Sequence, residues 1–149
     1  MEKRTASVKW LENMAFETEV NGHKITLDAD SDFGGENRGP RPKNLMLSAL
    51  GGCTAMDVIA ILKKMRVDVT GLNVIIEGDL TDVHPKHFSG MHIIYEFSGK
   101  DLPLDKLKTA VELSQDKYCG VTAVYKKGMD ITFEIKMVGD GSRKTEVRS

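Results

Sequence analysis

Only two cysteines, Cys53 and Cys119, occur among the 149 residues of the chain. Two cysteines are too few for the disulfide framework of a small secreted protein, so such a pair in a reducing compartment is catalytic, redox-sensing or simply buried. Residues 1–5 are not followed by an apolar run, and neither a signal peptide nor a transit sequence is expected. The predicted location is therefore the cytoplasm.

The chain also lacks an excess of either charge. Lys and Arg total 21 and Asp and Glu total 22, which gives a formal net charge of −1, and the basic residues are spread along the sequence. Neutralising the phosphates of a nucleic acid needs a basic face. Nucleic acid is therefore not an expected partner.

A long uninterrupted apolar run is missing as well. Residues 45–62 are largely apolar, but small and polar residues interrupt them, among them Asp57. An aspartate in the middle of a bilayer costs about 2.5 to 3.5 kcal/mol. The segment is predicted to be a buried helix of a soluble protein, and no membrane partner is expected.

What remains is an ordinary globular composition, with 40% apolar and 29% charged residues. This length is typical of one domain with one hydrophobic core, so a single domain over 1–149 is predicted. Its structured part is expected at about 6–138, followed by a polar tail at 139–149 that is predicted to be disordered.

Apolar patterns predict strands at 6–10, 74–80, 91–97 and 131–137, the second and third forming an antiparallel pair. Asn21-Gly22 is typical of a type I′ hairpin turn. A two-residue loop there predicts three cross-strand pairs: Val20 with His23, Thr18 with Ile25, and Phe16 with Leu27. Helices are predicted at 42–66, at 104–118 and, after a break near Cys119-Gly120, at 121–127. The order of elements indicates an α+β fold.

The helix predicted at 42–66 is apolar on every side before Lys63-Lys64. Such a helix must be enclosed by other elements. Complete enclosure by one small chain is difficult, which favours an intertwined homodimer.

Residues 28–42 form a polar segment that is too long for a simple connection, and such loops are mobile or functional. Arg38 and Arg41 are its cations nearest the start of the long helix. They are either solvated loop charges or partners of a thiolate or another anion.

Cys53 follows Gly51 and Gly52 within the predicted helix, and two glycines there cost about 1 kcal/mol each relative to alanine. Their absence of side chains lets another backbone, helix or substrate approach the turn that carries the thiol. A reactive thiol must ionise, and Asp57, one turn on, opposes this unless it is paired elsewhere. Taken alone, Cys53 is better explained as a small buried residue.

Cys119 lies at the predicted helix break, where its backbone is less constrained. A buried thiol and a thiol at a mobile junction suit a peroxidatic and resolving pair, in which the second thiol condenses with a sulfenic acid on the first. Two unrelated thiols remain the alternative.

The sequence gives no support for a metal or a cofactor. The four histidines (His23, His84, His87 and His92) lack an accompanying Cys-x-x-Cys pair and are explained as loop and strand residues. Gly34, Gly35 and Gly39 match no phosphate-binding motif.

Two cysteine-containing regions resemble the OsmC/Ohr superfamily, and most closely its YhfA-like branch. They comprise GPRPKNL at 39–45 with ALGGCTAMDV at 49–58, and AVELS at 110–114 with KYCGV at 117–121. The resemblance covers about 6–138. It implies an intertwined α+β homodimer with antiparallel sheets around a long buried central helix, and the reduction of hydroperoxides by Cys53 as peroxidatic and Cys119 as resolving cysteine.

The chain departs from that family where the thiolate is activated. Members carry a glutamate about ten positions before the reactive cysteine, which orients an arginine, whereas this chain has Lys43 there and no arginine at 10–16. We hypothesise that Arg38, Arg41 or Lys43 activates the thiolate instead.

The function predicted from sequence is thiol-dependent reduction of an organic hydroperoxide substrate, with recharging by a dithiol reductant. Two alternatives remain. One is a dimeric binding protein for an apolar or acyl molecule, with redox-sensitive but non-catalytic cysteines, and the other is a structural dimer. Shared fold alone does not decide among them.

Overall fold

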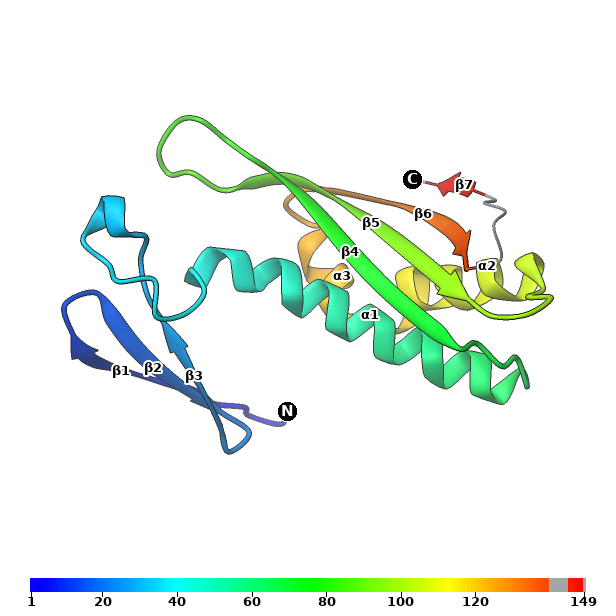
Figure 1. Cartoon of the computed structure of the whole chain (residues 1–149), viewed down its shortest axis with the longest axis horizontal. Helices are drawn as coiled ribbons and strands as arrows, with labels where there is room; N and C mark the ends of the chain where they lie inside the picture. Colours follow the sequence, from blue (N-terminus) through cyan, green and yellow to red (C-terminus); the bar gives the residue numbers. More distant parts are fainter. Residues whose placement is uncertain (140–144, 149) are drawn as a thin grey trace. The chain divides into compact units, whose positions relative to one another are not determined.

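The computed structural model describes residues 1–139 and 145–148 (Figure 1). Contacts within the chain divide it into two compact units, Met1–Met46 and Leu47–Ser149. The single domain expected from the sequence stays a prediction.

The first unit contains a three-stranded antiparallel sheet in the order β1-β2-β3. Its strands are β1 (Ser7–Glu12), β2 (Ala15–Val20) and β3 (His23–Leu27). Asn21 and Gly22 both have positive φ, at 52° and 79°, as a type I′ turn requires. The three predicted cross-strand pairs of this hairpin are confirmed.

The loop after β3 is organised around a buried carboxylate. Asp28 accepts hydrogen bonds from the backbone N–H groups of Ala29 at 2.7 Å and of Glu36 and Arg38 at 3.1 Å. A Cβ at Gly39 would overlap a backbone carbonyl of β3, so only glycine permits this close return of the chain. The loop therefore has a defined conformation held by these hydrogen bonds. It also contains the short 3₁₀ turn η1 (Ser31–Phe33).

The second unit contains a four-stranded mixed sheet in the order β4-β5-β6-β7. Its strands are β4 (Gly71–Leu80), β5 (Phe88–Ser98), β6 (Asp130–Val138) and β7 (Thr145–Arg148). The antiparallel pairing of β4 with β5 is confirmed. β5 and β6 are parallel, unlike the antiparallel sheets implied by the resemblance, because the chain crosses over through helices between them.

The C-terminal tail differs in part from the disorder predicted for it. Thr145–Arg148 forms β7 and pairs antiparallel with β6, because the edge of β6 offers unpaired backbone groups. The rest of the predicted tail beyond Gly139, at 140–144 and 149, lies outside the described residues.

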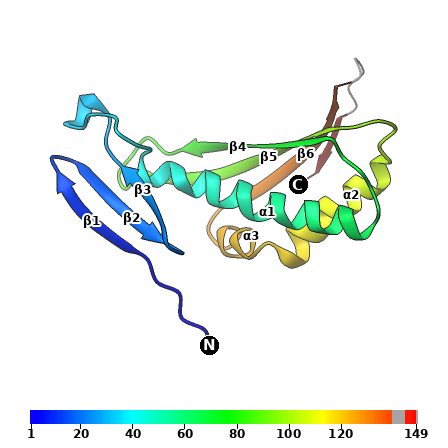
Figure 2. The ribbon, with the colours of Figure 1, turned by 60° about the horizontal axis from the view of Figure 1, so that its bottom comes forward.

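The helices begin and end close to their predicted bounds. They are the 3₁₀ turn η2 (Pro42–Asn44), α1 (Leu45–Lys64), α2 (Leu104–Leu113), the π-helical turn η3 (Ser114–Tyr118) and α3 (Gly120–Tyr125). Figure 2 shows α1, α2 and α3 on one side of the four-stranded sheet. The core of this unit therefore lies between that face and the helices.

α1 buries one stripe within the chain, with Leu50, Thr54, Val58 and Leu62 spaced one turn apart. Its other side is uncovered, and Met56 is 77% exposed there. By length and composition alone Pro42–Lys64 could also cross a membrane, although 28% of an 18-residue stretch within it is buried inside the chain. The enclosure expected from the sequence is thus present on one side of the helix.

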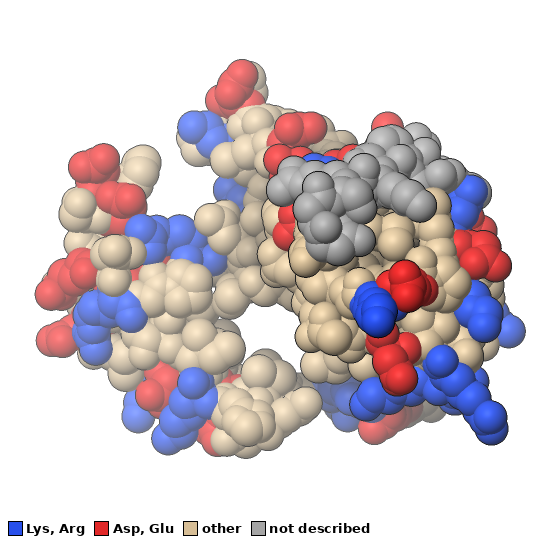
Figure 3. Space-filling view, turned by 45° about the vertical axis from the view of Figure 1, so that its right-hand side comes forward, with Lys and Arg blue, Asp and Glu red and all other residues tan. Residues whose placement is uncertain are grey.

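Charged side chains of both signs are interspersed on the face that Figure 3 shows. Exposed ion pairs such as Arg4 with Glu2 at 3.2 Å contribute little to stability, because water screens them.

Candidate functional site

Cys53 lies in the middle of α1, directly after its two glycines. A Cβ on Gly51 would lie 3.2 Å from the side chain of Ile76 on β4, whereas a Cβ on Gly52 would meet nothing within 4 Å. The neighbour at Gly51 is therefore a side chain from a strand, rather than the backbone, helix or substrate expected from the sequence.

Cys119 lies at the predicted break, between η3 and α3. Its backbone is extended (φ −74°, ψ 103°), and its N–H donates to the carbonyl of Ser114 at 2.7 Å. The Thr122 N–H donates to its Sγ at 3.4 Å, so the thiol caps the start of α3. The side chain is buried, in contrast to Cys53, which is partly exposed.

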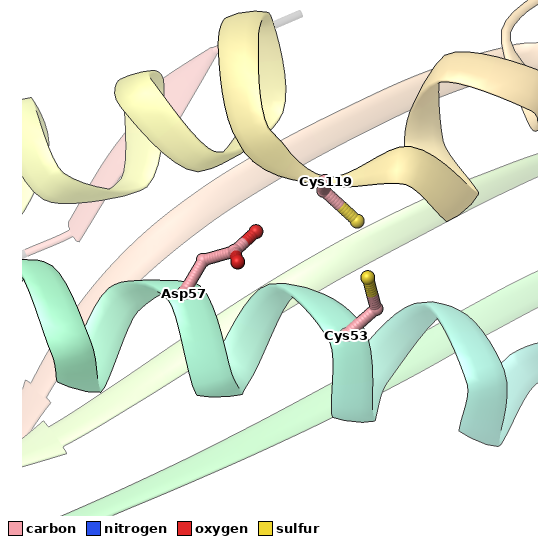
Figure 4. A group of neighbouring side chains, drawn as sticks. All are labelled: Cys53, Asp57 and Cys119. Atoms are coloured by element: carbon pink, nitrogen blue, oxygen red, sulfur yellow. The ribbon is translucent and has the colours of Figure 1, made fainter. Parts of the chain in front are cut away.

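The fold brings both thiols and one carboxylate together (Figure 4). The sulfurs of Cys53 and Cys119 and a carboxylate oxygen of Asp57 all lie within 4.8 Å of one another. Cys53 and Asp57 are one helical turn apart on α1, so they share a face. Both thiols are free, and a disulfide between them would need an S–S distance of about 2.05 Å.

The surroundings of Cys53 favour its neutral form. Burial raises the pKa of Cys53 above its ordinary value of 9.0, and the Cys119 thiol and Asp57 raise it further. A backbone N–H from Val121 donates to the sulfur and opposes this, but the pKa remains raised. A cysteine that is held as a thiolate needs a lowered pKa. Residues 47–139 do not lower the pKa of Cys53 in this way.

The three predicted activating cations lie in the first unit. Arg38 pairs with Glu12 at 3.3 Å, Arg41 pairs with Asp30 at 3.4 Å, and Lys43 is exposed. All belong to Met1–Met46, whereas Cys53 belongs to the other unit. Their action on the thiolate stays a prediction.

A buried polar network, which the sequence did not reveal, adjoins the thiols. Thr54 Oγ1 lies 2.6 Å from the Tyr95 hydroxyl and 2.8 Å from Ser114 Oγ, and Ser114 donates to Asp57 Oδ2 at 3.0 Å. The Gln115 amide donates to Thr54 Oγ1 at 3.1 Å and to the Tyr95 hydroxyl at 3.0 Å. One signal was available, since a tyrosine in an apolar strand needs a partner for its hydroxyl when buried.

Among the described residues, the side chains that could together bind a metal ion are these same three, Cys53, Asp57 and Cys119. They supply three donors, whereas a closed structural zinc site has four. Among residues 1–139, none of the four histidines joins a group of this kind. The donor set therefore does not match a structural metal site.

Two hollows are relevant to small molecules. A pocket of about 370 Å³ is lined by Asp57 together with Ala60, Ile61, Lys64, Met65, Leu113 and Tyr118. The first unit separately contains an open groove of about 960 Å³ with Val8, Phe16, Leu27 and Phe33 among its lining residues. The smaller pocket gives access to the carboxylate that lies beside the thiols.

Several known proteins share this fold. A crystal structure of a hypothetical protein from Aquifex aeolicus matches with a TM-score of 0.79 and 30% identity, over 93% of this chain and 100% of that one. The organic hydroperoxide resistance protein OsmC from Legionella pneumophila matches with a TM-score of 0.68 over 91% of this chain and 97% of its own. At 16% identity, the second likeness shows the fold alone.

Sequence comparison shows which protein family the chain is related to. Protein YhfA from Escherichia coli is 34% identical over 134 residues, which are 89% of this chain and 97% of YhfA. The model of the family described as OsmC-like protein matches residues 34–134, a range that includes both cysteines. The chain therefore belongs to the OsmC-like protein family.

Proposed function

We propose that the protein reduces organic hydroperoxides with Cys53 and Cys119 and is recharged by a dithiol. The observation that carries this proposal is the meeting of the two sulfurs within 4.8 Å, although 66 positions of sequence (119 − 53) separate them. The names of fold relatives, such as the organic hydroperoxide resistance protein from Legionella pneumophila, support the choice of substrate.

The exposure of the thiols supports the order in which they act in this proposal. Cys119 is 3% exposed, whereas Cys53 is more accessible, so a peroxide reaches Cys53 first. Its sulfur attacks one peroxide oxygen, the O–O bond breaks, and a sulfenic acid and an alcohol form. Cys119 then attacks the oxidised sulfur, water leaves and a disulfide forms. A dithiol returns both cysteines to thiols, as a reducing cytoplasm would allow.

The test is the consumption of an organic hydroperoxide by the reduced chain in the presence of dithiothreitol. We expect catalytic turnover and, when the dithiol is omitted, one peroxide consumed per chain with a Cys53–Cys119 disulfide in the peptide map. Failure to exceed the rate of dithiothreitol alone would contradict the proposal.

A second candidate is a binding protein for an apolar or acyl molecule. The raised pKa of Cys53 and the open groove of about 960 Å³ in the first unit favour it. A ligand that co-purifies with the protein and stays bound after both cysteines are replaced, without any peroxide turnover, would decide for this function.

We also infer that the protein is a homodimer. The uncovered side of α1 carries Met56, and the sheet of the first unit separately exposes Val8 and Trp10 at 60% and 62%. Apolar surface of this kind on an OsmC-like chain is best covered by a second copy.

Replacing Met56 by lysine is expected to weaken such a dimer at least about tenfold, because a lysine ammonium resists removal from water. Sedimentation equilibrium of wild type and Met56→Lys measures this directly. Val83→Lys is the control, because Val83 is 76% exposed in the β4–β5 connection. A monomeric wild type, or equal dimerisation by Met56→Lys, would contradict the inference.

A further inference from the structure

Peroxide reduction by Cys53 needs a group that handles a proton. The thiol must lose its proton to attack, and the departing alkoxide must gain one. Because the pKa of Cys53 is raised, little thiolate is present beforehand. A proton carrier beside the sulfur would meet both needs.

The hydrogen bonds of the buried network have a direction. Thr122 donates its hydroxyl to Gln115 Oε1 at 3.2 Å, which orients the amide so that its NH₂ faces Thr54 and Tyr95. Both of those hydroxyls accept from the amide, so their own hydrogens point elsewhere. Because Ser114 donates to Asp57 Oδ2, the consistent arrangement is that the Tyr95 hydroxyl donates to Thr54 and the Thr54 hydroxyl donates to Ser114.

This chain ends on the Asp57 carboxylate. Thr54 and Ser114 are fully buried, so their hydroxyls have no competing water within the chain. The donor from Ser114 holds one side of the carboxylate, while a carboxylate oxygen lies within 4.8 Å of both sulfurs. Asp57 is therefore an oriented acceptor beside the thiols.

We infer that Asp57 is the proton carrier of the proposed reaction: it accepts the Cys53 thiol proton as the sulfur attacks and delivers it to the alkoxide. This inference rests on the proposed function. The S–O bond forms as the O–O bond breaks, sulfur loses two electrons to the peroxide, and the thiol proton ends on the alcohol. Asp57 is regenerated as a carboxylate.

The same carboxylate serves the second step. Cys119 attacks the sulfenic acid on Cys53, the S–S bond forms and the S–O bond breaks. The Cys119 proton passes through Asp57 to the leaving hydroxide, which departs as water. Because its carboxylate lies within 4.8 Å of both sulfurs, one group can act in both steps.

Among the described residues, the ionisable groups near Asp57 lie on more than one element. Cys53 and Lys64 lie on its own helix, Tyr118 and Cys119 lie at the end of η3, and Tyr95 reaches it through Thr54 and Ser114. A purely electrostatic role for Asp57 would raise the pKa of Cys53 and slow every reaction of the thiol. A proton carrier instead speeds peroxide reduction, so the two roles predict opposite effects on that reaction.

The experiment compares Asp57→Asn with wild type in two reactions of the reduced full chain. Alkylation of Cys53 by iodoacetamide releases iodide and needs no proton, so its pH midpoint is expected to move to lower pH. Reduction of cumene hydroperoxide is expected to slow about 100-fold, the typical contribution of a general acid–base group. Asp116→Asn is the matched control, because Asp116 is an exposed aspartate on η3.

A second pair of variants keeps the test valid if Asp57→Asn unfolds. Formate is expected to restore part of the peroxide activity of Asp57→Ala through the adjoining pocket, and Asp57→Glu is expected to retain part without formate. Peroxide reduction by Asp57→Asn at the wild-type rate, or Asp57→Ala activity that formate does not raise, overturns the inference alone. A wild type without peroxide turnover overturns the proposed function as well.

Discussion

Replacing Cys53 by serine is expected to lower peroxide turnover by about three orders of magnitude or more, because a serine hydroxyl cannot accept the peroxide oxygen. The loss is read as consumption of cumene hydroperoxide with dithiothreitol, above the rate of the dithiol alone. The variant keeps the side-chain size, so the packing of α1 is expected to stay as it is.

Cys119→Ser distinguishes the two cysteines. Without a partner thiol, Cys53 is expected to react once with peroxide and to remain a sulfenic acid, which dimedone traps and mass spectrometry detects. Turnover by Cys53→Ser at the wild-type rate would contradict the assignment. A dimedone adduct on Cys119 in Cys53→Ser would reverse the order of the two thiols.

Replacing Thr54 by valine is expected to lower the free energy of unfolding by about 2 to 3 kcal/mol. The two side chains have almost the same shape, so the loss arises from polar groups and not from a cavity. Thr54 is fully buried and its hydroxyl is shared by Tyr95, Ser114 and Gln115. Each of these groups loses a partner in an environment without water.

Urea unfolding followed by circular dichroism measures this effect. Thr109→Val is the control, because Thr109 is exposed on α2 and donates only to the carbonyl of Asp105 at 2.9 Å. We expect its free energy of unfolding to change by less than about 0.5 kcal/mol. Equal effects of the two substitutions would mean that the network does not stabilise the fold.

The elements best predicted from the sequence were those that depend on neighbours along the chain. The Asn21-Gly22 turn fixes the β2–β3 register within a few residues, and every predicted pair is present. The break at Cys119 was also predictable, because Gly120 follows it and the helical pattern ends there.

The pairing of strands that are distant in the sequence was harder to predict from the sequence. The parallel contact of β5 with β6 depends on how the intervening helices return the chain, which no local pattern encodes. The strand β7 lies in a polar tail without strand-like alternation, so only the free edge of β6 explains it.

For the site, the sequence identified both thiols but assigned Asp57 only an opposing charge. That charge does raise the pKa of Cys53. The hydrogen bond from Ser114, which comes from another helix, gives Asp57 a fixed partner that spacing along α1 could not indicate.

The sequence by itself determined the family, the hairpin, the long cysteine helix and the break that carries the second cysteine, because each depends on residues close together in the chain. Only the tertiary structure decided that Cys53, Asp57 and Cys119 meet within 4.8 Å. The packing of α1 and the η3–α3 junction on one face of the sheet brings these groups together, and such packing depends on contacts between distant segments.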